Sequence, residues 1–153
     1  MNQPHARDDS DPDGRRLVRA HVRHGWIGLS AFVLLGIALE GLHAFKSSMY
    51  LGVGNETRRL MWTLAHAHGV GLSLVQLGFA ASVGLVGAAL AGKLRNAGRL
   101  LDGASLLIPS GFFLGGVVTY EGDPGIGIVL VPLGALLLLA AVGRIAWVFC
   151  RND

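Results

Sequence analysis

The sequence predicts an all-α fold, a four-helix transmembrane bundle made of two antiparallel hairpins. Of its 153 residues, 52% are hydrophobic and only 15% are charged, whereas a soluble domain has about 25% charged residues. The charge-poor stretches form four runs, and each reaches the roughly 20 residues that a helix needs to cross a bilayer core. Backbone polar groups in lipid must bond within their own element, so runs of this length form helices. The composition excludes soluble and nucleic-acid-binding proteins, and a single cysteine excludes a disulfide framework.

The chain divides into a polar tail and one membrane domain. Residues 1–14 contain four aspartates and are predicted to be a disordered tail. Residues 15–153 are predicted to form a single four-helix transmembrane domain, whose spans cover about 24–46, 58–91, 99–120 and 125–149. The first span is too long for a signal peptide and contains Glu40, so it is expected to remain in the mature protein.

The distribution of lysine and arginine predicts the orientation. Ten of these residues fall in the tail, the middle loop and the C-terminal end, and three fall on the other side. Positive charge favours the cytoplasmic side of short loops. Both termini are therefore predicted to be cytoplasmic, in a multi-pass protein of the inner (plasma) membrane. The third span has about 21 residues between Arg99 and Glu121, whereas the second has more than 30 between Arg59 and Gly92, so the first hairpin is expected to stand about two turns taller on the outer side.

Polar residues of the first two spans suggest a metal site near the outer face. Glu40 and His43 are three residues apart and share a helix face, a spacing used by metal sites in helix bundles. A turn centred near residues 54–55 would place His43 level with His66, and Glu40 close to the level of His68. Imidazole and carboxylate suit zinc, copper or iron. The sequence therefore predicts that Glu40, His43, His66 and His68 bind a transition-metal ion that serves redox chemistry or metal handling.

The two histidines of the second span need not share that site. Residues two apart on a helix point about 200° apart, so both could bind one ion only if the helix were distorted there. In the simpler interpretation His66 faces the first helix, and His68 faces the third or fourth.

Several alternatives to a metal site remain open. His43 and His66 could be the axial ligands of a b-type haem, or the polar residues could simply hydrogen-bond across two helices. The chain could also be an accessory or structural subunit without a cofactor of its own. No motif identifies a catalytic residue, so an enzymatic role stays undecided. The expected partners are the lipid bilayer and either other membrane subunits or further copies of this chain, and no nucleic acid.

A second pair of charged residues lies in the other hairpin. With its turn centred on residues 121–124, Asp102 falls level with Arg144, and a structural ion pair is expected because isolated charges are costly at membrane depth. Four uncharged polar residues can form hydrogen bonds between helices: Gln76, Ser73, Ser105 and Ser110. His21 and His24 stand among arginines and are interpreted as surface residues rather than ligands.

Overall fold

The structure is a computed structural model, and it describes residues 12–86 and 88–151. The predicted all-α four-helix bundle is confirmed, with four helices that are long and apolar enough to cross a membrane. The described elements, in chain order, are α1 (Pro12–Ala44), α2 (Ser48–Leu51), α3 (Glu56–Val86), α4 (Ala88–Val117), β1 (Thr119–Tyr120), β2 (Asp123–Pro124), the 3-10 helix η1 (Ile126–Val129) and α5 (Leu130–Cys150).

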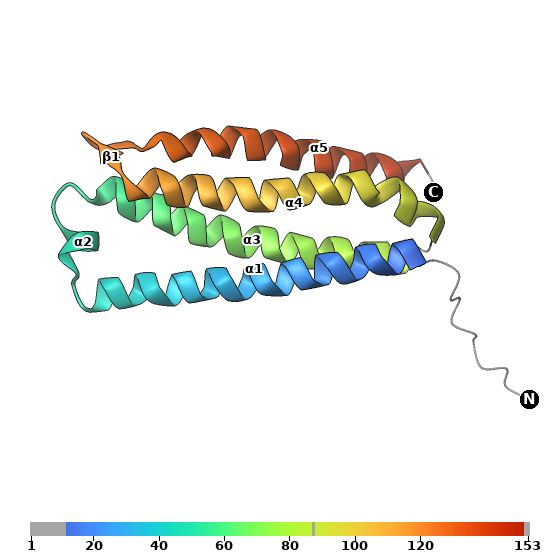
Figure 1. Ribbon diagram of the computed structural model, residues 1–153, viewed down its shortest axis with the longest axis horizontal. Helices are drawn as coiled ribbons and strands as arrows, with labels where there is room; N and C mark the ends of the chain where they lie inside the picture. Colours follow the sequence, from blue (N-terminus) through green and yellow to red (C-terminus); the bar gives the residue numbers. More distant parts are fainter. Residues whose placement is uncertain (1–11, 87, 152–153) are drawn as a thin grey trace, which may run out of the picture.

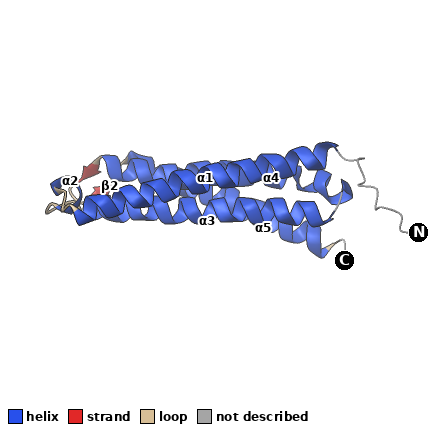
Figure 2. Cartoon of the chain, turned by 90° about the horizontal axis from the view of Figure 1, so that it is seen from below, coloured by secondary structure: helices blue, strands red, loops and turns tan. Residues whose placement is uncertain are grey.

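The four long helices form two antiparallel hairpins that lie side by side. Helix α1 packs on α3, α3 on α4, and α4 on α5, so that α3 and α4 are central and α1 and α5 are peripheral (Figures 1 and 2). Helix α1 begins and α5 ends at the same end of the bundle, where α3 also meets α4 (Figure 1). We call this the basic end, and the opposite end, which carries α2 and the β1–β2 turn, the capped end. Which side of a membrane each end faces stays a prediction.

Helix α1 begins earlier than the sequence predicts. Residues 1–11 of the expected tail lie outside the described residues, but Pro12 to Gly14 form the first turn of α1. Proline fits a first helical position because its φ angle is already helical and its missing N–H has no helical partner there. The carboxylate of Asp13 also accepts a hydrogen bond from Arg95 Nη2 at 2.7 Å, which ties this turn to α4.

The two hairpins end level with each other at the capped end. Arg58 at the start of α3 donates from Nε to the carbonyl oxygen of Gly116 at 3.0 Å, and Thr57 donates to the carbonyl oxygen of Gly122. The expected difference in height is therefore wrong. The reason is that α4 starts at Ala88, well before the predicted span, and is nearly as long as α3.

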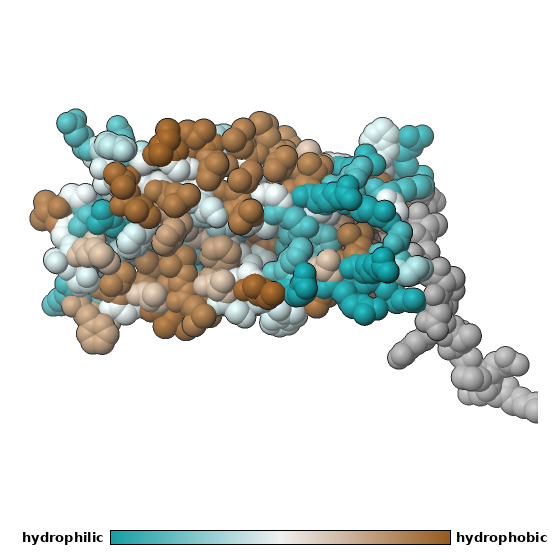
Figure 3. Space-filling model, viewed as in Figure 1, coloured by the Kyte–Doolittle hydropathy of each residue, from teal (hydrophilic) through white to brown (hydrophobic). Residues whose placement is uncertain are grey.

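Large apolar side chains cover much of the outer surface. In the most hydrophobic windows of α1 and α5 only 11% of residues are buried, against 39% in α3 and α4. Figure 3 shows the brown apolar surface over most of the bundle and the teal hydrophilic surface gathered towards the basic end. An apolar belt of this size is expected to contact lipid, because a soluble monomer rarely exposes so much apolar surface. The chain is therefore a multi-pass membrane protein by its architecture.

Candidate metal centre

Three of the four predicted metal ligands line one pocket between α1 and α3. Glu40, His43 and His66 border a cavity of about 430 Å³ near the capped end, together with Tyr50 and Thr63. His66 donates from Nδ1 to the carbonyl oxygen of Phe32 at 2.7 Å, an interaction that fixes the orientation of its ring. The structure thus brings these three residues to one cavity.

The depths of these residues differ from the sequence-based expectation. A Cβ added at Gly36 would meet the His66 ring, so His66 is level with Gly36 and not with His43. His43 lies seven residues further along α1, which is about 10 Å at 1.5 Å per residue. The cause is the connection between the helices: residues 45–55 contain the short helix α2 and its flanking turns, which shifts the centre of the hairpin. This offset gives no support to a haem held between His43 and His66.

His68 points to a different neighbour. Its ring lies 4.8 Å from that of Phe112 on α4, and its Nδ1 contacts the carbonyl oxygen of Leu64 at 2.9 Å. The simpler interpretation, with His66 facing α1 and His68 facing a later helix, matches these contacts. Metal binding by Glu40, His43, His66 and His68 stays a prediction.

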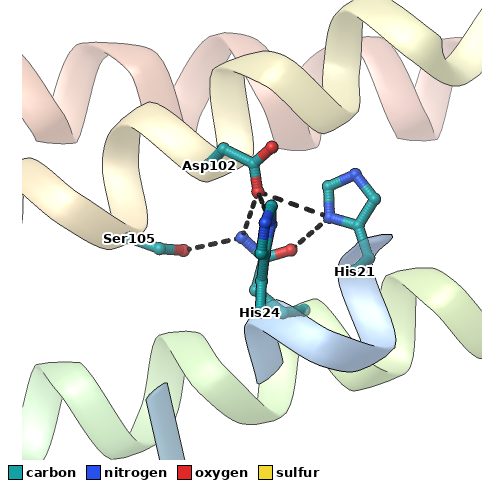
Figure 4. A network of polar contacts seen from close by, with 5 residues as sticks. His21, His24, Asp102 and Ser105 are labelled. Carbon is teal, nitrogen blue, oxygen red and sulfur yellow. Dashed lines mark hydrogen bonds and ion pairs between the residues drawn. The ribbon is translucent and has the colours of Figure 1, made fainter. Parts of the chain in front are cut away.

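A different set of possible ligands meets towards the basic end (Figure 4). His21 and His24 come from α1 and Asp102 from α4, and one ligand atom from each lies within 4.8 Å of the other two. His24 Nδ1 is 2.9 Å from Asp102 Oδ1, and His21 Nδ1 is 3.6 Å from the same oxygen. Among the described residues, this is the one group in which at least three potential ligands lie close enough together to hold a metal ion. We call these three residues the His-His-Asp cluster.

A glutamine from the third helix completes the network. Gln76 of α3 accepts a hydrogen bond from His21 Nδ1 through Oε1. Its Nε2 donates to Asp102 Oδ1 at 3.0 Å and to Ser105 Oγ at 3.1 Å. The predicted hydrogen bonds between helices are confirmed at Gln76 and Ser105, whereas Ser73 donates to the carbonyl oxygen of Gly69 in its own helix. Three helices therefore meet at a single amide group.

Close helix packing positions the buried histidine. The His21 side chain is only 2% exposed, and its ring stands edge-on to Phe79 at 4.7 Å between centroids. On the other side, a Cβ at Gly98 would come within 2.5 Å of His21 Nε2. Glycine at position 98 is what lets the ring fit between α1 and α4.

The other two members of the cluster remain reachable from outside. The side chains of His24 and Asp102 are 41% and 36% exposed. Placing His21 and His24 on the surface is thus wrong for His21, which is buried, and describes only His24. The cluster combines one fixed, buried ligand with two accessible ones, an arrangement through which an ion could enter.

Two of the three distances between donor atoms in the cluster are close to those of a metal site. A tetrahedral zinc ion, with ligands at about 2.0–2.2 Å, holds neighbouring donor atoms about 3.3 Å apart. The two separations from Asp102 Oδ1, 2.9 and 3.6 Å, lie on either side of this value. Without an ion, His24 Nδ1 donates a hydrogen bond to Asp102 Oδ1, whereas His21 Nδ1 donates to Gln76 Oε1 and lies too far from Asp102 for a hydrogen bond.

Asp102 does not contact the partner expected from the sequence. In the described part of the chain its partners are His21, His24 and Gln76, and no ion pair joins it to Arg144. Gly134 of α5 lies against the backbone of Ile108 of α4. Because the two helices are antiparallel, moving six residues along each towards the basic end brings residue 140 level with Asp102. Arg144 is four residues further towards the basic end, about 6 Å away along the helix axis.

A sequence pattern for the cluster was present. His21 and His24 have the same three-residue spacing as Glu40 and His43, and Asp102 is a charged residue within an apolar span. The neighbouring arginines favoured a different interpretation, in which this part of the helix is a solvated end and its histidines are surface residues. Only the rotation of α1 against α4 shows that the His21 side of this helix is buried.

The chain matches no protein-family model, and neither a curated protein nor a solved structure was found to match it.

Proposed function

We propose that this chain is a membrane protein that binds a divalent transition-metal ion, with zinc as the first candidate, through His21, His24 and Asp102. The observation that carries the proposal is the convergence of two imidazoles and a carboxylate from two helices within 4.8 Å. Two nitrogen donors and one oxygen donor suit zinc, and three protein ligands leave a fourth position for water or another ligand.

Gln76 supports this role by holding the ligands in place. Its Nε2 donates to the Asp102 carboxylate, and partners of this kind orient the ligands of metal sites. Its Oε1 accepts the Nδ1–H of His21, and this proton must leave before the same nitrogen can bind an ion. The side chains of His24 and Asp102 are partly exposed and lie within one helical turn of Arg23 and Arg99, so an ion can reach the site from the basic end. An exchangeable site fits metal handling at the basic end better than a permanently enclosed structural ion.

Metal analysis of purified variants tests the proposal. The wild-type protein, loaded with zinc and freed of excess, is expected to retain about one ion per chain by mass spectrometry. The variant His24→Ala changes a partly exposed side chain, so it should fold normally and lose most of the ion. Asp102→Asn should lose it as well, because a neutral amide is a poorer ligand.

The matched control is the double variant His43→Ala/His66→Ala, which removes two histidines from the capped-end pocket. It should retain the zinc of the wild type. If this control loses the ion while His24→Ala keeps it, the metal site is the one predicted from the sequence. If the wild type retains no zinc, copper or iron, the His-His-Asp cluster is a hydrogen-bonded contact between helices, and the accessory-subunit alternative gains support.

A further inference from the structure

A second site of recognisable chemistry lies between α4 and α5 at the basic end. A cavity of about 590 Å³ is lined by Lys93 from α4, by Gly143, Arg144, Trp147 and Val148 from α5, and by Arg151, which directly follows α5. Three of these six side chains are cationic and one is an indole. The cavity is separate from the His-His-Asp cluster, which contains none of these residues.

The position of Arg144 places this cavity at the depth of lipid headgroups. Residues 124–143 contain no charged side chain, and Arg144 is the first charge after Asp123. The 3-10 helix η1 and residues 130–143 of α5 together span about 29 Å, at about 2.0 and 1.5 Å per residue, which is close to the thickness of the hydrocarbon core. Arg144 therefore stands where the core ends, and Arg151 lies further out, in the headgroup layer.

In the described part of the chain, both arginines are open to an anion. Among the residues that the structure describes, neither Arg144 nor Arg151 forms an ion pair with a carboxylate. The Arg151 guanidinium lies 5.2 Å from the centre of the Trp147 ring, a cation–π contact that holds both side chains at the rim. A Cβ at Gly143 would meet no atom within 4 Å, so the cavity is open beside Arg144.

We propose that this cavity binds the phosphodiester headgroup of an anionic phospholipid. Guanidinium groups bind phosphate oxygens in pairs, and an indole at this depth is typical of the membrane interface. Basic pockets between transmembrane helices are suited to such headgroups. The acyl chains of the bound lipid would lie along the apolar outer face of α5, where Leu136 and Leu139 are 65% and 71% exposed.

Native mass spectrometry of the whole chain tests the site. The protein is purified in detergent, mixed with phosphatidylglycerol or phosphatidylcholine, and examined for retained lipid. The wild type should retain phosphatidylglycerol and release phosphatidylcholine. The double variant Arg144→Gln/Arg151→Gln should bind phosphatidylglycerol at least about tenfold more weakly, since it loses charge-assisted hydrogen bonds to phosphate.

The matched control removes the same charge from the other basic surface. Arg16 and Arg19 line a separate cavity on α1, and Arg16→Gln/Arg19→Gln should retain the lipid as the wild type does. The single variant Arg144→Lys keeps the charge but loses paired binding, and should show an intermediate loss even if the double variant fails to fold. A free anion is tested by adding inorganic phosphate at millimolar concentration, which should leave the bound lipid in place.

Three results would overturn the proposal. Equal retention by the wild type and by Arg144→Lys, together with equal retention by a folded double variant, would show that the arginines do not bind the lipid. Equal retention of phosphatidylcholine would show that charge is not recognised. Displacement of the lipid by inorganic phosphate would show that the cavity is a site for a soluble anion.

Discussion

At the scale of single residues, Gln76 explains how a polar group is tolerated between three helices. Its amide carries an acceptor and two donors without a net charge, and it uses both kinds of group on His21, Asp102 and Ser105. A buried polar atom without a partner costs about 1–3 kcal/mol. In the described residues no buried side-chain nitrogen or oxygen lacks a hydrogen-bond partner, so the network is complete even without an ion.

Gly98 provides the sharpest test of how that network is packed. In Gly98→Ala the new Cβ would lie 2.5 Å from His21 Nε2, and Gln76 and Phe79 on the other sides prevent the ring from moving away. We expect a loss of about 1–3 kcal/mol in stability, as for other overpacked interiors, together with weaker zinc retention. Thermal unfolding in detergent and metal analysis measure the two effects.

The matched control for this prediction is Gly92→Ala in the same helix. A Cβ at Gly92 would meet no atom within 4 Å, so this variant should not lose thermal stability and should retain zinc as the wild type does. If both alanine variants behave alike, the His21 ring is not confined by α4 in the way that the structure describes.

The residue types of the cluster were partly predictable from the sequence. Asp102 needs a partner because it is a charge near the end of an apolar span, and Gln76 is a natural bridge between helices. The identity of the partner was not predictable, because hydrophobicity gives the extent of each helix but not its rotation. His21 and His24 are three residues apart, yet their exposed fractions are 2% and 41%.

At the scale of elements, the register within each hairpin is the property that the sequence determines least. The number of helices and their approximate spans follow from the charge-poor runs alone. Which residues of two neighbouring helices lie at the same level depends on how the residues between the helices divide between helix and turn. Helix α2 and its turns displace His43 from His66 by about two turns, and the tight turn at Glu121 and Gly122, both with positive φ, displaces Arg144 from Asp102 by one turn.

Crosslinking distinguishes the observed register of α1 and α3 from the expected one. A Cβ at Gly28 would lie 3.6 Å from the Cβ of Ser73, within the range of about 3.5–4.5 Å found in disulfides. In a Cys150→Ser background, Gly28→Cys/Ser73→Cys should form a disulfide under a mild oxidant. Trypsin cleaves between the two positions, at Lys46, Arg58 or Arg59, so only the oxidised protein should keep its fragments together on a non-reducing gel.

The control pair follows the sequence-based register. In the register that puts His43 level with His66, Gly36 would be level with Ser73. The structure instead places Gly36 against His66, which is seven residues, or about 10 Å along α3, from Ser73. The variant Gly36→Cys/Ser73→Cys should therefore stay uncrosslinked. Efficient crosslinking of this pair, with none for Gly28→Cys/Ser73→Cys, would restore the sequence-based register.

At the scale of the whole molecule, the two ends of the bundle have different chemistry. Both the His-His-Asp cluster and the cationic cavity lie towards the basic end, whereas the pocket of Glu40, His43 and His66 lies near the capped end. An ion bound by His21, His24 and Asp102 would join α1 to α4, the first hairpin to the second. Metal binding is thus expected to stabilise the contact between hairpins, and not only the site itself.

The orientation of the bundle decides which compartment can supply that ion. The excess of lysine and arginine predicts that the basic end is cytoplasmic, and the chain has a natural reporter there because Cys150 is an exposed free thiol. In intact cells, a membrane-impermeant maleimide should leave Cys150 unlabelled until the membrane is permeabilised. Val53 at the capped end is fully exposed, so Val53→Cys in a Cys150→Ser background should be labelled at once. The opposite pattern would place the basic end outside and would make the external medium the source of the metal.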